Sequence, residues 1–383
     1  MNRIQIYTLF CLVLVSMHFL TGCPSETPLP GDAPAEESSS QDPSESEETV
    51  ETPPPADDPA TVTALEEAAT SLKKNDYGQV IEVNFRGADI TDESLKPLAN
   101  LIAVRSILLN DAQISDAALQ PIAGLETLEN LDLRGASIGN DALKYVSGLT
   151  SLRALRLNGS SGSTTVDDGG LEHLSGLKNL KALALDGLWI SEVGLEYVKD
   201  LPNLQELYLK ETLVEDAALE LVGKFPALRK LRLGKTGVSA TGIEHLTSLK
   251  LTMLDLSECS QLFDDAMIPL GKITTLEDLN LWRVQVTDTG AESLQTLVNM
   301  KVLNLDNTPI TNQAIDYLTG MDKLVFLHLG STGVTNDGIM KLAGLKNLKD
   351  LKVTRTAVTE EGVKALQEKL PDCEIQLRYI EGE

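Results

Sequence analysis

One apolar pattern recurs along most of the chain and constrains its fold more than any other feature. Each copy begins LxxLxL, continues through a small residue and an isolated apolar residue, and ends in a segment such as TNDGIMKLAGL, from Thr335 to Leu345. The fourth position usually returns after 24 residues, as in Val83, Ile107 and Leu131. A regular period of this length indicates a stack of similar units rather than one globular core.

The two halves of each copy predict different structures. In LxL, alternate side chains point to opposite faces of a strand, so the leucines face a core and the middle residue faces outward. In the second half the apolar residues are three or four apart, which predicts a short helix with one buried stripe. The expected helix N-caps are Thr91, Ser115, Thr287, Thr311, Thr335 and Thr359. Asp92, Asp116 and Asp288 follow, where an acidic group favours the helix dipole.

From about Gln79 to Ile380 this pattern resembles the leucine-rich-repeat family, with about twelve units in register. The resemblance implies an α/β solenoid, a horseshoe with a parallel concave sheet, short convex helices and terminal caps. The unit LDLSECSQLFDDAMIPL, from Leu254 to Leu270, is similar to the cysteine-containing subtype and keeps its cysteine as Cys259. That subtype occurs in F-box substrate receptors and in bacterial repeat proteins. No F-box segment is recognisable before the repeats, so a ubiquitin-ligase role is not implied.

Residues 1–22 are predicted to be a lipoprotein signal peptide. Arg3 supplies a short positive region, and the segment that follows is almost wholly apolar. The sequence LTGC, ending at Cys23, resembles the bacterial lipobox, which implies that Cys23 is lipidated and becomes the new N-terminus. An ordinary signal peptide and an uncleaved anchor are the alternatives. Pro24 follows, instead of the Asp that retains enterobacterial lipoproteins in the inner membrane, and this favours the outer membrane.

The remaining boundaries follow from composition. Residues 23–60 hold nine of the sixteen prolines, eleven acidic residues and no Lys or Arg, which predicts a disordered, acidic, Pro/Ser-rich tether. Residues 61–78 form the expected N-terminal helical cap, because Thr61 to Lys74 has helical apolar spacing. The repeats occupy 79–365. Residues 366–383 are expected to form a C-terminal cap with a last helix and an edge strand.

Charge and cysteine content restrict the function. The formal charge is −25, and without the signal segment and the tether about −15 remains, which argues against nucleic acid as a partner. Cys259 and Cys373 fall in distant units, so we expect no disulfide between them. We find no catalytic set or metal-ligand spacing in the sequence and expect no cofactor. Cys259 occupies a core position, where a buried thiol is inert.

The outward strand positions of the concave face are the expected binding surface. The candidate ligand-binding residues there are Arg156, Tyr208, Lys210, Lys230, Arg232, Trp282, Phe326 and His328. The cations among them could form a basic strip that holds an acidic group, with Tyr208 as an anchor. In the alternative interpretation they pair with Asp186, Glu206 and Glu211 and bind nothing. A four-residue insertion at 159–165 is either a binding loop or a tolerated loop without a role.

These features together predict a non-catalytic binding module. We expect it to be anchored by lipid on the periplasmic or external side of a bacterial membrane and to recognise a protein or a polysaccharide on its concave face. The alternative is a structural protein of the cell envelope without a specific ligand.

Overall fold

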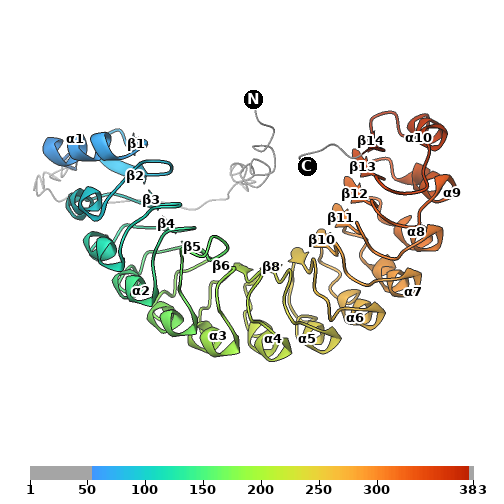
Figure 1. Cartoon of the computed structure of the whole chain (residues 1–383), viewed down its shortest axis with the longest axis horizontal. Coiled ribbons are helices and arrows are strands. Elements are labelled where there is room, and N and C mark those ends of the chain that lie inside the picture. Colours follow the sequence, from blue (N-terminus) through green and yellow to red (C-terminus); the bar gives the residue numbers. More distant parts are fainter. Residues whose placement is uncertain (1–53, 379–383) are drawn as a thin grey trace, which may run out of the picture. The chain divides into compact units, whose positions relative to one another are not determined.

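Short strands and helices alternate along the part of the chain that the structure describes. The computed structural model describes residues 54–378, so the predicted signal segment and most of the predicted tether lie outside the described residues. The described part is a curved array, with strands along the inner side of the arc and helices along its outer side (Figure 1). Within residues 54–378, no helix combines the length and apolar character that crossing a bilayer requires.

The strands form one 14-stranded sheet whose spatial order follows the sequence. The antiparallel pairing of β1 with β2 begins the sheet, and the later pairings are parallel and in register. The strands are β1 (Ser71–Lys74), β2 (Val80–Asn84), β3 (Ser106–Leu108), β4 (Asn130–Asp132), β5 (Ala154–Asn158), β6 (Ala182–Asp186), β7 (Glu206–Tyr208), β8 (Lys230–Arg232), β9 (Met253–Asp255), β10 (Asp278–Asn280), β11 (Val302–Asn304), β12 (Phe326–His328), β13 (Asp350–Lys352) and β14 (Glu374–Gln376).

The helices are short, and several are 3₁₀ rather than α. They are α1 (Pro59–Ala68), η2 (Asp92–Asn100), η3 (Asp116–Ile122), α2 (Asn140–Val146), η4 (Asp168–Leu174), α3 (Glu192–Val198), α4 (Asp216–Val222), α5 (Ala240–Glu244), α6 (Asp264–Leu270), α7 (Asp288–Ala291), η5 (Glu292–Thr296), α8 (Asn312–Leu318), α9 (Asn336–Met340), η6 (Lys341–Gly344) and α10 (Glu360–Gln367). Pro97 and Pro121 lie inside η2 and η3, where each removes a backbone donor.

The core is a continuous stack of leucines between sheet and helices. Leu254, Leu279 and Leu303 lie in register on β9, β10 and β11, and each is fully buried. Burial of successive units against each other, rather than of one unit alone, removes this apolar surface from water. The predicted strand register is therefore confirmed for these units.

The first helical residue of one unit commonly holds the helix N-cap of the next. The Asp264 carboxylate accepts a hydrogen bond from the Thr287 backbone N–H at 2.7 Å and another from its hydroxyl at 2.6 Å. The same pair of bonds joins Asp92 to Ser115, Asp168 to Ser191, Asp216 to Ser239 and Asp288 to Thr311. The residues predicted to be helix N-caps do occupy N-cap positions in the structure. The acidic residues do more than complement the helix dipole, because they join neighbouring units.

The glycine of the repeated helix segment leaves room for this contact. A Cβ placed on Gly290 would lie 2.4 Å from Asp264 Oδ1 and 3.0 Å from its Cα. A Cβ on Gly338 would likewise lie 2.2 Å from Asn312 Oδ1, the amide oxygen that holds Thr335. A side chain at Gly290 or Gly338 would therefore displace the preceding unit's Asp or Asn as it is placed here, whereas two other units that make the same contact accommodate Ala118 and Ala314 at the equivalent position.

The N-terminal cap differs from the prediction. The helix is shorter than the expected Thr61 to Lys74 and ends at Ala68, because Ser71–Lys74 instead pairs with β2 as an antiparallel strand. The cap also begins inside the predicted tether. Asp57 is buried, and its carboxylate accepts a hydrogen bond from the Val80 N–H, while Asp58 caps α1 by accepting from the Thr61 N–H at 2.9 Å. These two acidic residues are capping groups rather than solvated tether residues.

The C-terminal cap contains the predicted edge strand, β14, but no additional helix within the described residues. The helix expected from Leu366 is the end of α10, which begins at Glu360 like the helix of any other unit. Leu370 and Cys373 are buried beneath the edge strand and close the core.

Candidate binding surface

Two rows of side chains line the inner side of the arc. They flank the buried leucine at the centre of each strand and therefore share one face of the sheet. From β7 to β12 the first row is Glu206, Lys230, Met253, Asp278, Val302 and Phe326, and the second row is Tyr208, Arg232, Asp255, Asn280, Asn304 and His328. Neighbouring positions within a row are about 4.8 Å apart. The rows pass through three regions of different chemistry.

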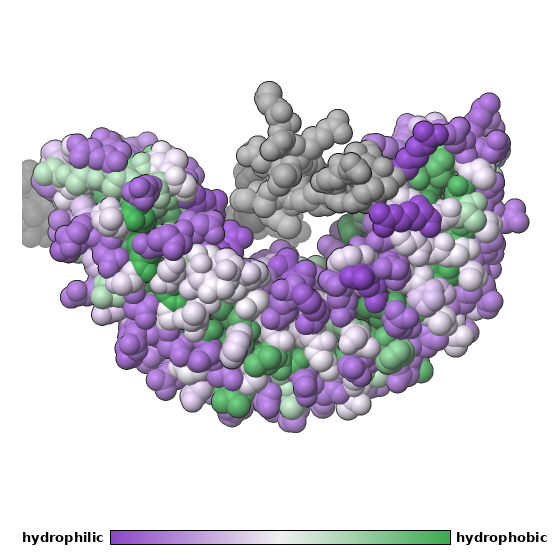
Figure 2. Space-filling view, in the orientation of Figure 1, coloured by the Kyte–Doolittle hydropathy of each residue, from purple (hydrophilic) through white to green (hydrophobic). Residues whose placement is uncertain are grey.

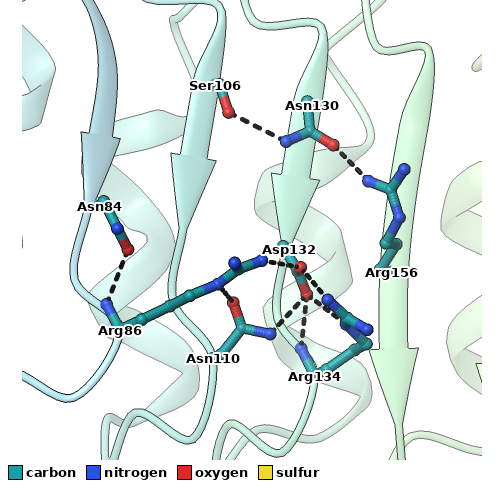
Figure 3. A network of polar contacts seen from close by, with 8 residues as sticks. All are labelled: Asn84, Arg86, Ser106, Asn110, Asn130, Asp132, Arg134 and Arg156. Atoms are coloured by element: carbon teal, nitrogen blue, oxygen red, sulfur yellow. Dashed lines mark hydrogen bonds and ion pairs between the residues drawn. The ribbon is translucent and has the colours of Figure 1, made fainter. Parts of the chain in front are cut away.

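The N-terminal region is a closed polar network around Asp132 (Figure 3). The Asp132 side chain is 2% exposed, and Arg134 approaches both of its carboxylate oxygens, at 2.9 and 2.7 Å. Arg86 Nη2 donates to the same carboxylate at 2.9 Å, as does Asn110 Nδ2. Burial opposes ionisation of Asp132, but the bonds and charges of Arg134 and Arg86 outweigh it and lower the pKa of Asp132. Arg86 and Arg134 therefore already bind a carboxylate of the solenoid itself.

The predicted insertion lies beside this network. Its Ser161 lines a hollow of about 410 Å³ together with Arg86, Arg134 and Asn158. Gly159 is pressed against the next unit, since a Cβ there would lie 2.4 Å from the Gly187 carbonyl oxygen. The insertion is thus packed at its base. Its role, as a binding loop or as a tolerated loop without a role, stays a prediction.

The central region contains the predicted basic strip, but its cations are paired. Lys230 Nζ lies 2.8 Å from Glu206, and Arg232 Nη1 lies 2.8 Å from Asp186. The Arg232 guanidinium also stacks 4.6 Å from the centre of the Tyr208 ring. These are ion pairs that the alternative interpretation predicts, so that pairing is present for Lys230 and Arg232.

The other two cations of the predicted strip lie apart from Lys230 and Arg232. Arg156 donates to the Asn130 side chain, at the margin of the N-terminal network. Lys210 lies beyond the end of β7, where its backbone N–H donates to Asp186 at 2.8 Å. The structure therefore brings Tyr208, Lys230 and Arg232 together and leaves Arg156 and Lys210 at the margins. A ligand-binding role for any of them stays a prediction.

The C-terminal region exposes apolar side chains on the sheet. Met253, Val302 and Phe326 are half-buried neighbours in the first row, interrupted only by Asp278. The rings of Phe326 and His328 meet edge to face, with centroids 6.3 Å apart. Trp282 lies beyond the end of β10, with the Arg283 guanidinium 5.4 Å from its ring centre. We call Met253, Val302, Phe326 and Trp282 the apolar strip. Sequence reasoning named only its two aromatic members.

Asp278 is an anomaly within this strip. Burial, and then the charge of Asp255, raise the pKa of Asp278 to about 6, while Lys230 partly opposes the shift. The carboxylate lies between Met253 and Val302 in the register, so its neighbours along the row offer no hydrogen bond. A partner that covers this strip would desolvate Asp278 further. The residue was missed because its neighbours in space are 24 or 25 residues away in sequence.

A second exposed apolar group lies outside both rows. Trp189 is 76% exposed, and Leu213, at the equivalent position of the next unit, is 58% exposed. Val193 and Tyr197 on α3 are also exposed and border a hollow between α3 and α4. In the view of Figure 2, hydrophobic residues show as separate patches on an otherwise largely hydrophilic face. We call Trp189, Leu213, Val193 and Tyr197 the side patch.

The cysteines and acidic groups of the described part are not arranged as a nucleophilic or metal site would require. Burial raises the pKa of the Cys259 thiol, whose sulfur donates to the Leu233 carbonyl oxygen at 3.1 Å. Burial likewise raises the pKa of Cys373 to about 11, and both thiols are free. Such thiols are poor nucleophiles. Within residues 54–378, no three His, Cys, Asp or Glu side chains converge as metal ligands would.

Comparison with solved structures finds proteins of similar architecture. An internalin from Listeria monocytogenes matches with a TM-score of 0.56 at 19% identity, over 84% of this chain and 94% of the internalin. The fold is a leucine-rich-repeat solenoid. A TDR receptor matches with a TM-score of 0.51 at 15% identity, over 79% of this chain and 56% of the receptor. No protein-family model and no curated protein matches the sequence. At these identities the likeness concerns the fold, and function must be argued from the solenoid's own surfaces.

Proposed function

We propose that this solenoid is a non-catalytic binding module that recognises a protein through the apolar strip of its concave face. The observation that carries the proposal is the row of Met253, Val302 and Phe326 on β9, β11 and β12, interrupted on β10 by Asp278, with Trp282 just beyond the end of β10. Aromatic residues and Met are enriched at the centres of protein interfaces, where charged residues are depleted. The ion pairs around Arg232 supply the polar rim that surrounds such a centre.

The wider setting of the module is also a proposal. We propose that lipid on Cys23 holds the protein at a bacterial membrane, on the periplasmic or outer side, and that the acidic segment after it sets the solenoid away from the surface. The lipobox-like LTGC sequence and the acidic composition of residues 23–53 support this arrangement. In this setting the concave face would be open to proteins of the envelope or of the surroundings.

A capture experiment tests the proposed function. The full chain would serve as bait for cross-linking in solubilised membranes of cells that express it, and captured proteins would be identified by mass spectrometry. Trp282→Ala with Phe326→Ala should reduce capture of the wild-type partner at least thirtyfold, because one aromatic anchor contributes about 2 kcal/mol or more. The matched control is Val298→Ala with Val325→Ala, since both valines are exposed but lie outside the two rows. Undiminished capture by the aromatic double variant would contradict the proposal.

A structural envelope role is the second candidate, and the side patch favours it. An exposed Trp189 beside Leu213 could support contact between copies. Sedimentation equilibrium of the full chain in detergent decides between the two. Self-association lost in Trp189→Ala with Leu213→Ala, but kept in Trp282→Ala with Phe326→Ala, would favour the structural role. A monomer that captures a defined partner would favour the binding module.

A further inference from the structure

A row of polar residues, all but one of them charged, borders the sheet at the start of its strands. Each member directly precedes a strand, and from β3 to β8 the row is Arg105, Glu129, Arg153, Lys181, Gln205 and Arg229. Backbone hydrogen bonds of 2.8–2.9 Å join every member to the next, so the order and the spacing are fixed. Successive members are about 4.8 Å apart. We call these six residues the edge row.

The first four members of the edge row line a surface hollow of about 470 Å³, to which Asn179 and Asn203 also contribute. Its wall is held in place by these two amides. Asn179 Nδ2 donates to the Thr150 carbonyl oxygen and Asn203 Nδ2 to that of Lys178, each at 2.9 Å. The volume falls in the range that small ligands and short polymer segments occupy. We call this hollow the edge pocket.

The cations of the edge pocket differ from those of the concave face in having few partners. Arg105 and Arg153 share the single carboxylate of Glu129, at 3.9 and 3.5 Å, which is longer than a hydrogen bond. Among residues 54–378, the side chains of Arg105, Arg153 and Lys181 donate no hydrogen bond, whereas Arg86, Arg134 and Arg232 each donate at least one. Both arginines of the pocket remain more than half exposed.

The charge balance of the pocket favours an anion. Three cations face only two carboxylates, those of Glu129 and the neighbouring Glu126, in a domain that is otherwise strongly acidic. Arg guanidinium groups suit bidentate contacts with carboxylate, phosphate or sulfate, and Lys adds a compact positive charge. The row spacing sets the separation of the groups they would hold, about 5 Å between Arg153 and Lys181 and about 10 Å between Arg105 and Arg153.

We propose that the edge pocket binds a multivalent oxyanion, a ligand that carries two or more carboxylate, phosphate or sulfate groups about 5 to 10 Å apart. Arg153 and Lys181 hold one group, and Arg105 holds the next. An acidic oligosaccharide and a polyphosphate share this chemistry. The site is separate from the apolar strip, because it borders β3 to β6 whereas the strip lies on β9 to β12 and just beyond β10. The solenoid can therefore hold this ligand and a protein partner at the same time.

Titration calorimetry of the full chain, with tripolyphosphate and trigalacturonate as probes, tests the proposal. At least one probe should bind, and its affinity should fall as salt is raised. Arg153→Gln with Lys181→Gln should weaken binding at least tenfold. The matched control is Lys301→Gln, because Lys301 also directly precedes a strand but pairs with Glu277 at 2.7 Å and lies outside the pocket. The probe that binds more tightly identifies a phosphate or a carboxylate ligand.

A variant that removes a negative charge, and should therefore bind the probe more tightly, distinguishes a specific binding site from general attraction between charges. Glu129→Gln should strengthen binding several-fold, because it frees both arginines from their shared carboxylate. Glu277→Gln removes the same charge from an equivalent position outside the pocket and should leave affinity unchanged. These positions are exposed or half-buried, so thermal melting should match the wild type. Absence of binding by both probes, or equal losses in the pocket and control variants, would overturn the proposal.

Discussion

At the scale of single residues, Asp278 is the clearest departure from ordinary surface chemistry. Its pKa of about 6 in the folded protein lies above the ordinary value of 3.8 expected in the unfolded chain. Between these two values the folded protein keeps a proton that the unfolded chain has released. The free energy of unfolding contributed by Asp278 therefore falls as the pH rises from about 4 to about 6. At neutral pH the ionised carboxylate destabilises the fold.

Asp278→Asn should raise the melting temperature at pH 7 and lose this advantage as the pH approaches 4. The gain at pH 7 is roughly 1 kcal/mol once solvent screening of a half-buried group is allowed for, or about 2 °C. Melting curves followed by circular dichroism at pH 4, 5, 6 and 7 measure the effect. Asp200→Asn, at an exposed position, is the control. A constant difference between Asp278→Asn and the wild type at every pH would contradict the argument.

At the scale of elements, the contact between one helix start and the next couples neighbouring units. Asp264→Ala removes both hydrogen bonds to Thr287 and should lower the free energy of unfolding by about 1 to 2 kcal/mol. Asp264→Asn should cost less, because Asn312 and Asn336 already make the equivalent contacts with Thr335 and Thr359. Urea unfolding midpoints measure both. Equal losses for Ala and Asn would show that the carboxylate acts by charge alone.

The strands could be predicted well from the sequence, because the same alternation of buried and outward residues recurs with a period of about 24 residues. Leu279 and its equivalents are specified by alternation within one strand and need no knowledge of distant residues. The start of the solenoid was predicted less well, since β1 depends on pairing with β2 rather than on its own helical apolar spacing. The central ion pairs were predicted only as the alternative to a ligand-binding strip, for a related reason. Arg232 meets Asp186 two strands away, and periodicity does not reveal where long side chains end.

At the scale of the whole molecule, the solenoid keeps different surfaces apart. The closed polar network around Asp132 spans β2 to β5, and the edge pocket borders the start of β3 to β6. The central ion pairs lie on β6 to β8, and the apolar strip lies on β9 to β12. A globular core of the same size would bring such groups together. A solenoid instead presents them in chain order, so that one partner can contact several regions or two ligands can bind separately.

Attachment of the whole molecule to a membrane would depend on Cys23. If Cys23 carries lipid, two or more acyl chains would give stable attachment, whereas one chain gives only marginal binding. Cys23→Ser should release the protein into the soluble fraction or leave an unprocessed precursor. Cys11→Ser is the matched control, because it removes a cysteine of the same apolar segment without changing the LTGC sequence. Fractionation, gel mobility and labelling with a fatty-acid analogue measure the outcome. A Cys23→Ser protein that remains in the membrane, mature in size and still labelled, would rule out anchoring through this residue.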